Sequence, residues 1–169
     1  MESKKECLIH MKDLVVYYSL EGNTREAAEI IAGRLHADIL RLNTVKEIPR
    51  NKMKYVIGGM QAVFGVCAKV KPIALNPEQY DRIILGTPVW AGKPAPAINT
   101  FLKSCNVKDK ITALFTLSAG GDNERCVRNL RKKLNNLKTT VALADRNLPH
   151  ASENHRKLDE FVEELINGK

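Results

Sequence analysis

Residues 19–24 have the sequence Ser-Leu-Glu-Gly-Asn-Thr and carry side chains that could bind a phosphate group. Ser19 and Thr24 provide hydroxyl groups and Asn23 provides an amide, all of which can donate hydrogen bonds to a small dianion. The apolar run at residues 14–18 predicts a buried strand, and an amphipathic helical pattern begins directly after the segment. A helix N-terminus presents free N–H groups and the positive end of the helix dipole, so the segment is a candidate site for a phosphate monoester.

Phosphate binding at this segment would depend on neutral donors. The segment contains no Lys, unlike a Walker A loop, and the chain has no G-x-G-x-x-G motif of the kind that binds dinucleotides. An ordinary strand-to-helix turn is the alternative interpretation, in which Asn23 caps the helix and Glu26 completes a pair that resembles a capping box. The sequence alone leaves both interpretations open.

Two more predicted strands end in segments that could line a binding site. Residues 80–86 predict the third strand and lead into Thr-Pro-Val-Trp-Ala-Gly at 87–92, and residues 110–117 predict the fourth strand and lead into Ser-Ala-Gly-Gly-Asp at 118–122. Trp90 is the only tryptophan of the chain. A single tryptophan usually fills a core, but this one lies in a segment expected at the surface, where its indole could stack on an aromatic ligand.

Strands and helices alternate along the chain, which predicts an α/β fold: a doubly wound, five-stranded parallel sheet with helices on both faces. The predicted strands lie near residues 14–18, 39–42, 80–86, 110–117 and 140–144, and the predicted helices near 27–35, 54–68, 96–105, 124–134 (capped by Asp122 or Asn123) and 158–166. Polar residues interrupt the second strand, which favours an edge position and the strand order 2-1-3-4-5. Right-handed crossovers then place the first and last helices on one face. The three candidate segments follow strands one, three and four, so they should meet at the carboxyl end of the sheet.

The size and cysteine content indicate an ordinary globular protein. The 169 residues suit one domain, which we expect at residues 12–169 after a short disordered leader at 1–11. The N-terminal residues do not form a secretory signal, and no apolar run approaches the ~20 residues of a membrane helix. The cysteines form no C-x-x-C pair, so neither a metal site nor a redox pair is expected. Cys67, Cys105 and Cys126 fall in helical patterns and are expected to be buried thiols in a reducing cytosol, which predicts a cytoplasmic protein.

The formal net charge of +8 is the unusual bulk property of the chain. Much of the excess lies on or just after one predicted helix, in Arg125, Arg128, Arg131, Lys132, Lys133 and Lys138. A solvated helix face is the ordinary explanation for such a run, and a docking patch is the alternative. Aromatic residues make up only 5% of the chain, which leaves little material for stacking on nucleic-acid bases.

The chain from Asp13 onward resembles the short-chain flavodoxins. The resemblance rests on Tyr-Tyr-Ser-Leu-Glu-Gly-Asn-Thr at residues 17–24 and Gly-Thr-Pro-Val-Trp-Ala-Gly-Lys-Pro at residues 86–94. It implies that the protein binds FMN noncovalently and transfers low-potential electrons between redox partners without turning over a substrate. By the same resemblance, the cofactor would be held by a phosphate loop, a ring-lining second loop and a third loop, formed by Ser19, Leu20, Glu21, Gly22, Asn23, Thr24, Thr87, Pro88, Val89, Trp90, Ala91, Gly92, Ser118, Ala119, Gly120, Gly121 and Asp122.

Two residues of these motifs have specific expected roles. Glu21 would offer its backbone N–H to the phosphate, because its carboxylate would be repelled by a dianion. Gly92 can take a positive φ at little cost, so we expect a neighbouring peptide to reorient and its carbonyl to accept a hydrogen bond from the reduced flavin N5. No residue is expected to be catalytic.

The chain departs from the better-known flavodoxins in two ways. The third loop has no aromatic residue, so one face of the flavin ring would be open, and the surface is basic where that of the family is commonly acidic. We therefore expect acidic redox partners for a monomer or weak dimer that binds neither nucleic acid nor a membrane.

An FMN-dependent NAD(P)H:quinone or flavin reductase is the main alternative function, because it would use the same three loops with one flavin face exposed. A low-molecular-weight phosphatase also has a phosphate loop after its first strand. Its chemistry needs a Cys thiolate where this chain has Ser19, which argues against that class.

Overall fold

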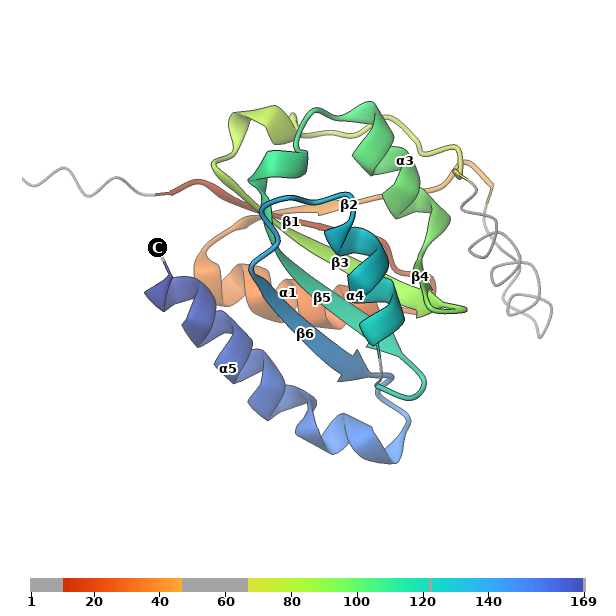
Figure 1. Ribbon diagram of the computed structural model, residues 1–169, viewed down its shortest axis with the longest axis vertical. Helices are drawn as coiled ribbons and strands as arrows, with labels where there is room; N and C mark the ends of the chain where they lie inside the picture. The colour runs from red at the N-terminus through yellow and green to blue at the C-terminus, as the bar shows by residue number, and fades with distance from the viewer. Residues whose placement is uncertain (1–10, 47–66, 122, 169) are drawn as a thin grey trace, which may run out of the picture.

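A parallel β-sheet lies between two layers of helices in the computed structural model of the chain, which describes residues 11–46, 67–121 and 123–168 (Figure 1). The strands are β1 (Asp13–Tyr17), β2 (Asp38–Arg41), β3 (Arg82–Trp90), β4 (Lys93–Pro94), β5 (Ile111–Ser118) and β6 (Thr139–Ala144). The α-helices are α1 (Asn23–Leu35), α3 (Pro96–Ser104), α4 (Glu124–Arg131) and α5 (Asn154–Asn167), and short 3₁₀ helices span Pro77–Gln79, Lys108–Lys110 and Pro149–Glu153.

The parallel strands lie in the order β2-β1-β3-β5-β6, and β4 pairs antiparallel with the end of β3. The predicted order 2-1-3-4-5 is thus confirmed for the parallel strands. The sheet has one more strand than predicted, because the third strand runs on to Trp90 instead of ending at Gly86 and then turns back on itself.

Both faces of the sheet are apolar because helices cover both. β1 is buried along its whole length, and its side chains alternate between two core clusters: Leu14 and Val16 belong to one, and Val15 and Tyr17 to the other. Residues of α3 and α4 complete the first cluster, and residues of α1 and α5 complete the second. The first and last helices therefore share one face of the sheet, as predicted (Figure 1).

Two predictions lie largely outside the described residues: the leader at 1–11 and the helix at 54–68. Cys67 and Ala68, which the structure does describe, are not helical. Cys67 is exposed, Cys105 is half-buried just after α3, and Cys126 is buried in α4. The prediction of a buried thiol is wrong for Cys67, because this residue lies in an irregular surface segment.

The start of α4 also differs from the prediction. Asn123 occupies the N-cap position, but its side chain forms no capping hydrogen bond. Its Nδ2 instead donates to Oγ1 of Thr116 in β5 over 2.6 Å, which ties the start of the helix to the buried sheet. Asp122, the alternative cap, lies outside the described residues. Across the described ranges, no helix is long and apolar enough to cross a membrane.

Candidate functional site

A cavity of about 260 Å³ lies at the carboxyl end of the sheet, where the segments after four parallel strands meet. Its lining residues are Ser19, Leu20, Glu21, Asn23, Thr24, Pro88, Val89, Trp90, Ala91, Leu117, Ser118, Ala119 and Asp145. The structure therefore brings together residues of all three candidate segments, as the predicted strand order requires.

The N-terminus of α1 has no side-chain cap. Gly22 occupies the N-cap position with φ 102°, a left-handed conformation that glycine adopts at little cost, and its N–H donates to Oγ of Ser19 over 3.0 Å. The capping predicted by the alternative interpretation is wrong, because Asn23 lies inside the helix and the Glu26 N–H makes an ordinary helical bond to the Gly22 carbonyl. Ser19 and Thr24 are buried and line the cavity at the start of α1, where the first N–H groups of the helix have no partner within the helix.

Asp145, which the sequence reading missed, lines the same cavity from the segment after β6. Its Oδ1 accepts a hydrogen bond from Asn23 Nδ2 over 3.2 Å, and its N–H donates to the Ser118 carbonyl over 3.0 Å. Asp145 thus connects the first and third candidate segments. The sequence could have indicated Asp145, because this residue directly follows the fifth predicted strand and so lies at the same edge of the sheet as the three candidate segments.

The second candidate segment is a β-hairpin rather than the predicted surface loop. β3 continues through Trp90, which pairs with Lys93 of β4, and only Ala91 and Gly92 form the turn. Both turn residues have positive φ, 49° and 72°, which is the backbone signature of a type I′ turn and matches the twist of the paired strands.

Thr87 supports this hairpin from inside and does not line the cavity. The residue is fully buried, its Oγ1 accepts a hydrogen bond from the Ala95 N–H over 3.0 Å, and the same hydroxyl donates to the Pro88 carbonyl over 2.9 Å. Thr87 therefore fixes the two arms of the hairpin relative to each other.

Trp90 is half-buried in the wall of the cavity. Its ring meets the ring of Tyr18 edge to face, with centroids 5.9 Å apart and an interplanar angle of 90°. Such an edge contact is a favourable aromatic geometry for the indole. Stacking of this indole on a ligand remains a prediction.

The predicted glycines lie around the cavity without lining it. The Gly92 carbonyl accepts a hydrogen bond from Asn129 Nδ2 over 3.3 Å, so α4 holds the second segment. In the third segment, Ser118 and Ala119 line the cavity, whereas Gly121 lines a neighbouring groove and Gly120 lines neither. Asp122 is outside the described residues.

Comparison with known proteins identifies the family. Residues 12–165 match the family model for flavodoxins. The chain belongs to the flavodoxin family. No curated protein matches it at a significant level.

Solved structures agree with this flavodoxin assignment. A protein from Bacteroides eggerthii DSM 20697 shares the fold with a TM-score of 0.70 and 24% identity, covering 89% of this chain and 98% of that one. A flavoprotein from Lactobacillus acidophilus NCFM in complex with FMN is 27% identical, with a TM-score of 0.61 and coverage of 87% and 98%. A flavodoxin, WrbA-like protein from Agrobacterium tumefaciens shares the fold with a TM-score of 0.57 and 18% identity, covering 94% and 99%.

Proposed function

We propose that this flavodoxin-family protein binds FMN noncovalently in the cavity and carries electrons between partner proteins. The observation that carries the proposal is the uncapped N-terminus of α1 beside buried Ser19 and Thr24, together with the indole of Trp90 in the wall of the same cavity. A phosphorylated planar ring needs an anion site and an aromatic surface within one pocket. The FMN complex of the related Lactobacillus protein supports the choice of ligand.

The donor set fits a phosphate held by neutral groups. Glu21 and Asp145 line the cavity, and no Lys or Arg of the described residues does. The hydroxyls of Ser19 and Thr24 and the first N–H groups of α1 would hold the phosphate, while the Glu21 carboxylate would point away from it. Bound FMN would supply one- and two-electron transfer, and the chain would set its position and electrostatic surroundings.

The basic surface favours acidic redox partners. The net charge is +8, and Arg125, Arg128, Arg131 and Lys132 lie on or directly after α4, which begins beside the third segment. Complementary charge on a partner would raise the rate of encounter and orient it near the cavity.

An FMN-dependent reductase acting on quinones with NAD(P)H is the second candidate function. It is favoured by the third segment, where Ala119 and Gly120 are exposed and no described residue is aromatic. An open flavin face of this kind would admit a second small substrate.

The first test is a titration of the flavin-free protein with FMN. Because Trp90 is the only tryptophan, its fluorescence reports directly on the cavity, and we expect FMN to quench it. Ser19→Ala removes a hydroxyl beside a charged ligand and should weaken FMN binding about 10-fold. Ser104→Ala is the matched control, since this exposed hydroxyl lies on α3 and bonds only within its own helix.

Failure to bind FMN would refute the proposal as a whole. Sustained oxidation of NADH or NADPH with a quinone would instead keep FMN and replace the carrier function by the reductase function. One-electron reduction of the bound flavin without such turnover is the result expected for a carrier.

A further inference from the structure

A second hollow, a groove of about 840 Å³, runs between α4 and β6 next to the cavity. Its helix side is formed by Val127, Arg128 and Arg131 with the adjoining Lys132, and its strand side by Thr140, Val141 and Ala142. Away from β6, α4 contacts the β3–β4 hairpin through the hydrogen bond from Asn129 to Gly92 (Figure 1).

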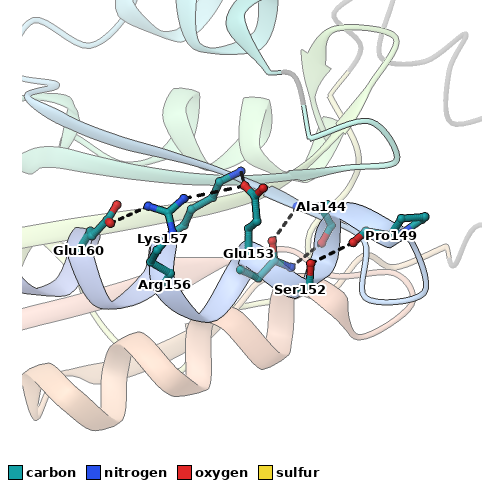
Figure 2. Close-up of polar contacts among 8 residues, drawn as sticks. Ala144, Pro149, Ser152, Glu153, Arg156, Lys157 and Glu160 are labelled. Atoms are coloured by element: carbon teal, nitrogen blue, oxygen red, sulfur yellow. Dashed lines mark hydrogen bonds and ion pairs between the residues drawn. The ribbon is translucent and has the colours of Figure 1, made fainter.

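β6 is the last strand of the sheet, and part of its outer edge is unpaired. The side chain of Asn154 brackets Ala144: its Oδ1 accepts from the Ala144 N–H over 3.0 Å, and its Nδ2 donates to the Ala144 carbonyl over 2.7 Å (Figure 2). These two bonds are those that a neighbouring strand would make. Because alternate residues of a parallel strand face the same side, Thr140 and Ala142 turn their N–H and C=O groups the same way as Ala144, and no described residue pairs with them.

The edge of β6 also lacks the usual protection against strand addition. Its residues, Thr139–Ala144, include no charged side chain and no proline, which are the common means of keeping other chains off an exposed edge. A sequence that leaves such an edge unprotected is suited to receiving another strand there.

The rim of the groove is strongly cationic. Arg128, Arg131 and Lys132 form no ion pair with any described residue, although Arg131 donates to the Leu137 carbonyl. Glu124, at the end of the groove next to the third segment, is the only carboxylate that lines it among the described residues. The rim therefore carries an excess of positive charge over the unpaired edge.

We propose that this groove binds an extended acidic segment of a partner protein, which adds to β6 as a further strand. Its backbone would pair with Thr140 and Ala142, and its carboxylates on the α4 side would pair with Arg128, Arg131 and Lys132. A second copy of this chain is a poor occupant because each copy carries a net charge of +8. Nucleic acid would satisfy the cations but not the backbone edge. The site does not depend on FMN, so the segment should bind both the flavin-free and the FMN-loaded protein.

The proposal can be tested with a capped peptide of alternating Glu and Val residues. We expect it to bind at low salt, to weaken as salt is added, and to slow hydrogen exchange at the amides of Thr140 and Ala142. A matched peptide with every backbone amide N-methylated keeps the charge but offers no N–H to the edge of β6, and it should bind about 10-fold more weakly or worse.

Variants of the protein separate the two contributions. The double variant Arg128→Glu, Arg131→Glu should weaken peptide binding about 10-fold or more by removing the rim charge. Its control is Arg156→Glu, Lys157→Glu on α5, which makes the same charge change among the ion pairs of another helix (Figure 2). Ala142→Pro removes an outward N–H that is not part of the β5–β6 ladder, and it should weaken peptide binding by a similar factor while FMN binding is unchanged.

Three results would overturn the proposal. The first is no peptide binding at low salt. The second is binding that is lost in the Arg128, Arg131 variant but unaffected by Ala142→Pro and by N-methylation, which would show simple charge attraction to the helix. The third is displacement of the peptide by a single-stranded oligonucleotide that binds the same face more tightly.

Discussion

Two features of the structure disfavour any side chain at Gly92. Its φ of 72° is left-handed, and a Cβ placed on it would lie 2.6 Å from Cδ of Arg125. We expect Gly92→Ala to lower the free energy of unfolding by about 1–2 kcal/mol from backbone strain. It should also shift the one-electron reduction potentials of bound FMN, since the turn could no longer reorient.

The control for this variant is Gly120→Ala. Gly120 lies in the third segment, and a Cβ there meets no atom within 4 Å. Urea unfolding and potentiometric titration of both variants compare the two glycines. Unchanged potentials in Gly92→Ala would contradict a role for this peptide in tuning the flavin.

Tyr80 makes the stability of the fold sensitive to alkaline pH. The ring is buried, and its hydroxyl donates to Asp38 Oδ2 over 2.6 Å. Burial first, and then the bond to this carboxylate, raise the pKa of Tyr80 from 10.0 to about 12. The fold favours the neutral phenol, so this contribution is complete below pH 10 and is lost as the pH rises towards about 12.

Tyr80→Phe should therefore lose stability less steeply than the wild-type protein over this pH range. Urea unfolding at several pH values measures the difference in free energy of unfolding between the two proteins. The titration of the lysines is common to both and cancels in this difference. Parallel stability curves would contradict the assigned role of Tyr80.

The sequence predicted the lining of the cavity best where neighbouring elements fix the place of a residue. Ser19 and Thr24 could be located from the sequence because a strand and a helix on either side of them fix their place. The supporting role of Thr87 could not be predicted from the sequence. Its partner is the N–H of Ala95, which lies beside Thr87 only once the hairpin has formed.

At the scale of elements, β3 shows why boundaries are difficult to predict. Thr-Pro-Val-Trp-Ala-Gly has the composition of a loop, yet the strand continues through Pro88 because the pairing with β5 and β4 compensates for the missing N–H. Composition reports local preference, whereas the strand is extended here by partners distant in the chain.

Gly86 couples β3 to β5 through close packing. An added Cβ would lie 2.1 Å from Cζ of Phe115, whose ring is fully buried. We expect Gly86→Ala to destabilise the protein by about 1–3 kcal/mol, because a close-packed core tolerates added volume poorly.

Gly33→Ala in α1 is the matched control for Gly86→Ala. A Cβ at Gly33 meets nothing within 4 Å, so the change should stabilise the helix by about 0.5–1 kcal/mol. Urea unfolding curves of the two variants should move in opposite directions. A Gly86→Ala protein as stable as the wild type would mean that the Phe115 ring can move aside without cost.

At the scale of the whole molecule, the strand order determines where the cavity forms. Alternating strands and helices predicted this order and the helix faces, because crossover handedness leaves few alternatives. The same order brings Asp145 beside Asn23, a contact that no local pattern indicates. Topology therefore predicts which segments meet, and side-chain geometry decides which residues touch.

The opposite end of the sheet carries a buried ion pair that ties β1, β3 and α5 together. Arg82 Nε and Nη2 donate to the two carboxylate oxygens of Asp13 over 2.9 and 2.7 Å, and Nη1 donates to the Leu165 carbonyl over 2.7 Å. The side chains of Arg82 and Asp13 are only 6% and 1% exposed, so removing either one leaves a charge without its main partner in a dry environment.

Arg82→Met should therefore lower the free energy of unfolding by about 3–5 kcal/mol, and the double variant Asp13→Val, Arg82→Met should recover much of this loss because it buries no unpaired charge. FMN binding should be unchanged in the double variant, since the pair lies at the amino ends of β1 and β3 and the cavity at their carboxyl ends. Urea unfolding and the tryptophan titration measure the two properties separately. If the loss of stability in the double variant equalled the sum of the losses in the two single variants, Asp13 and Arg82 would not be energetically coupled. The unpaired Leu165 carbonyl would then account for the loss in Arg82→Met.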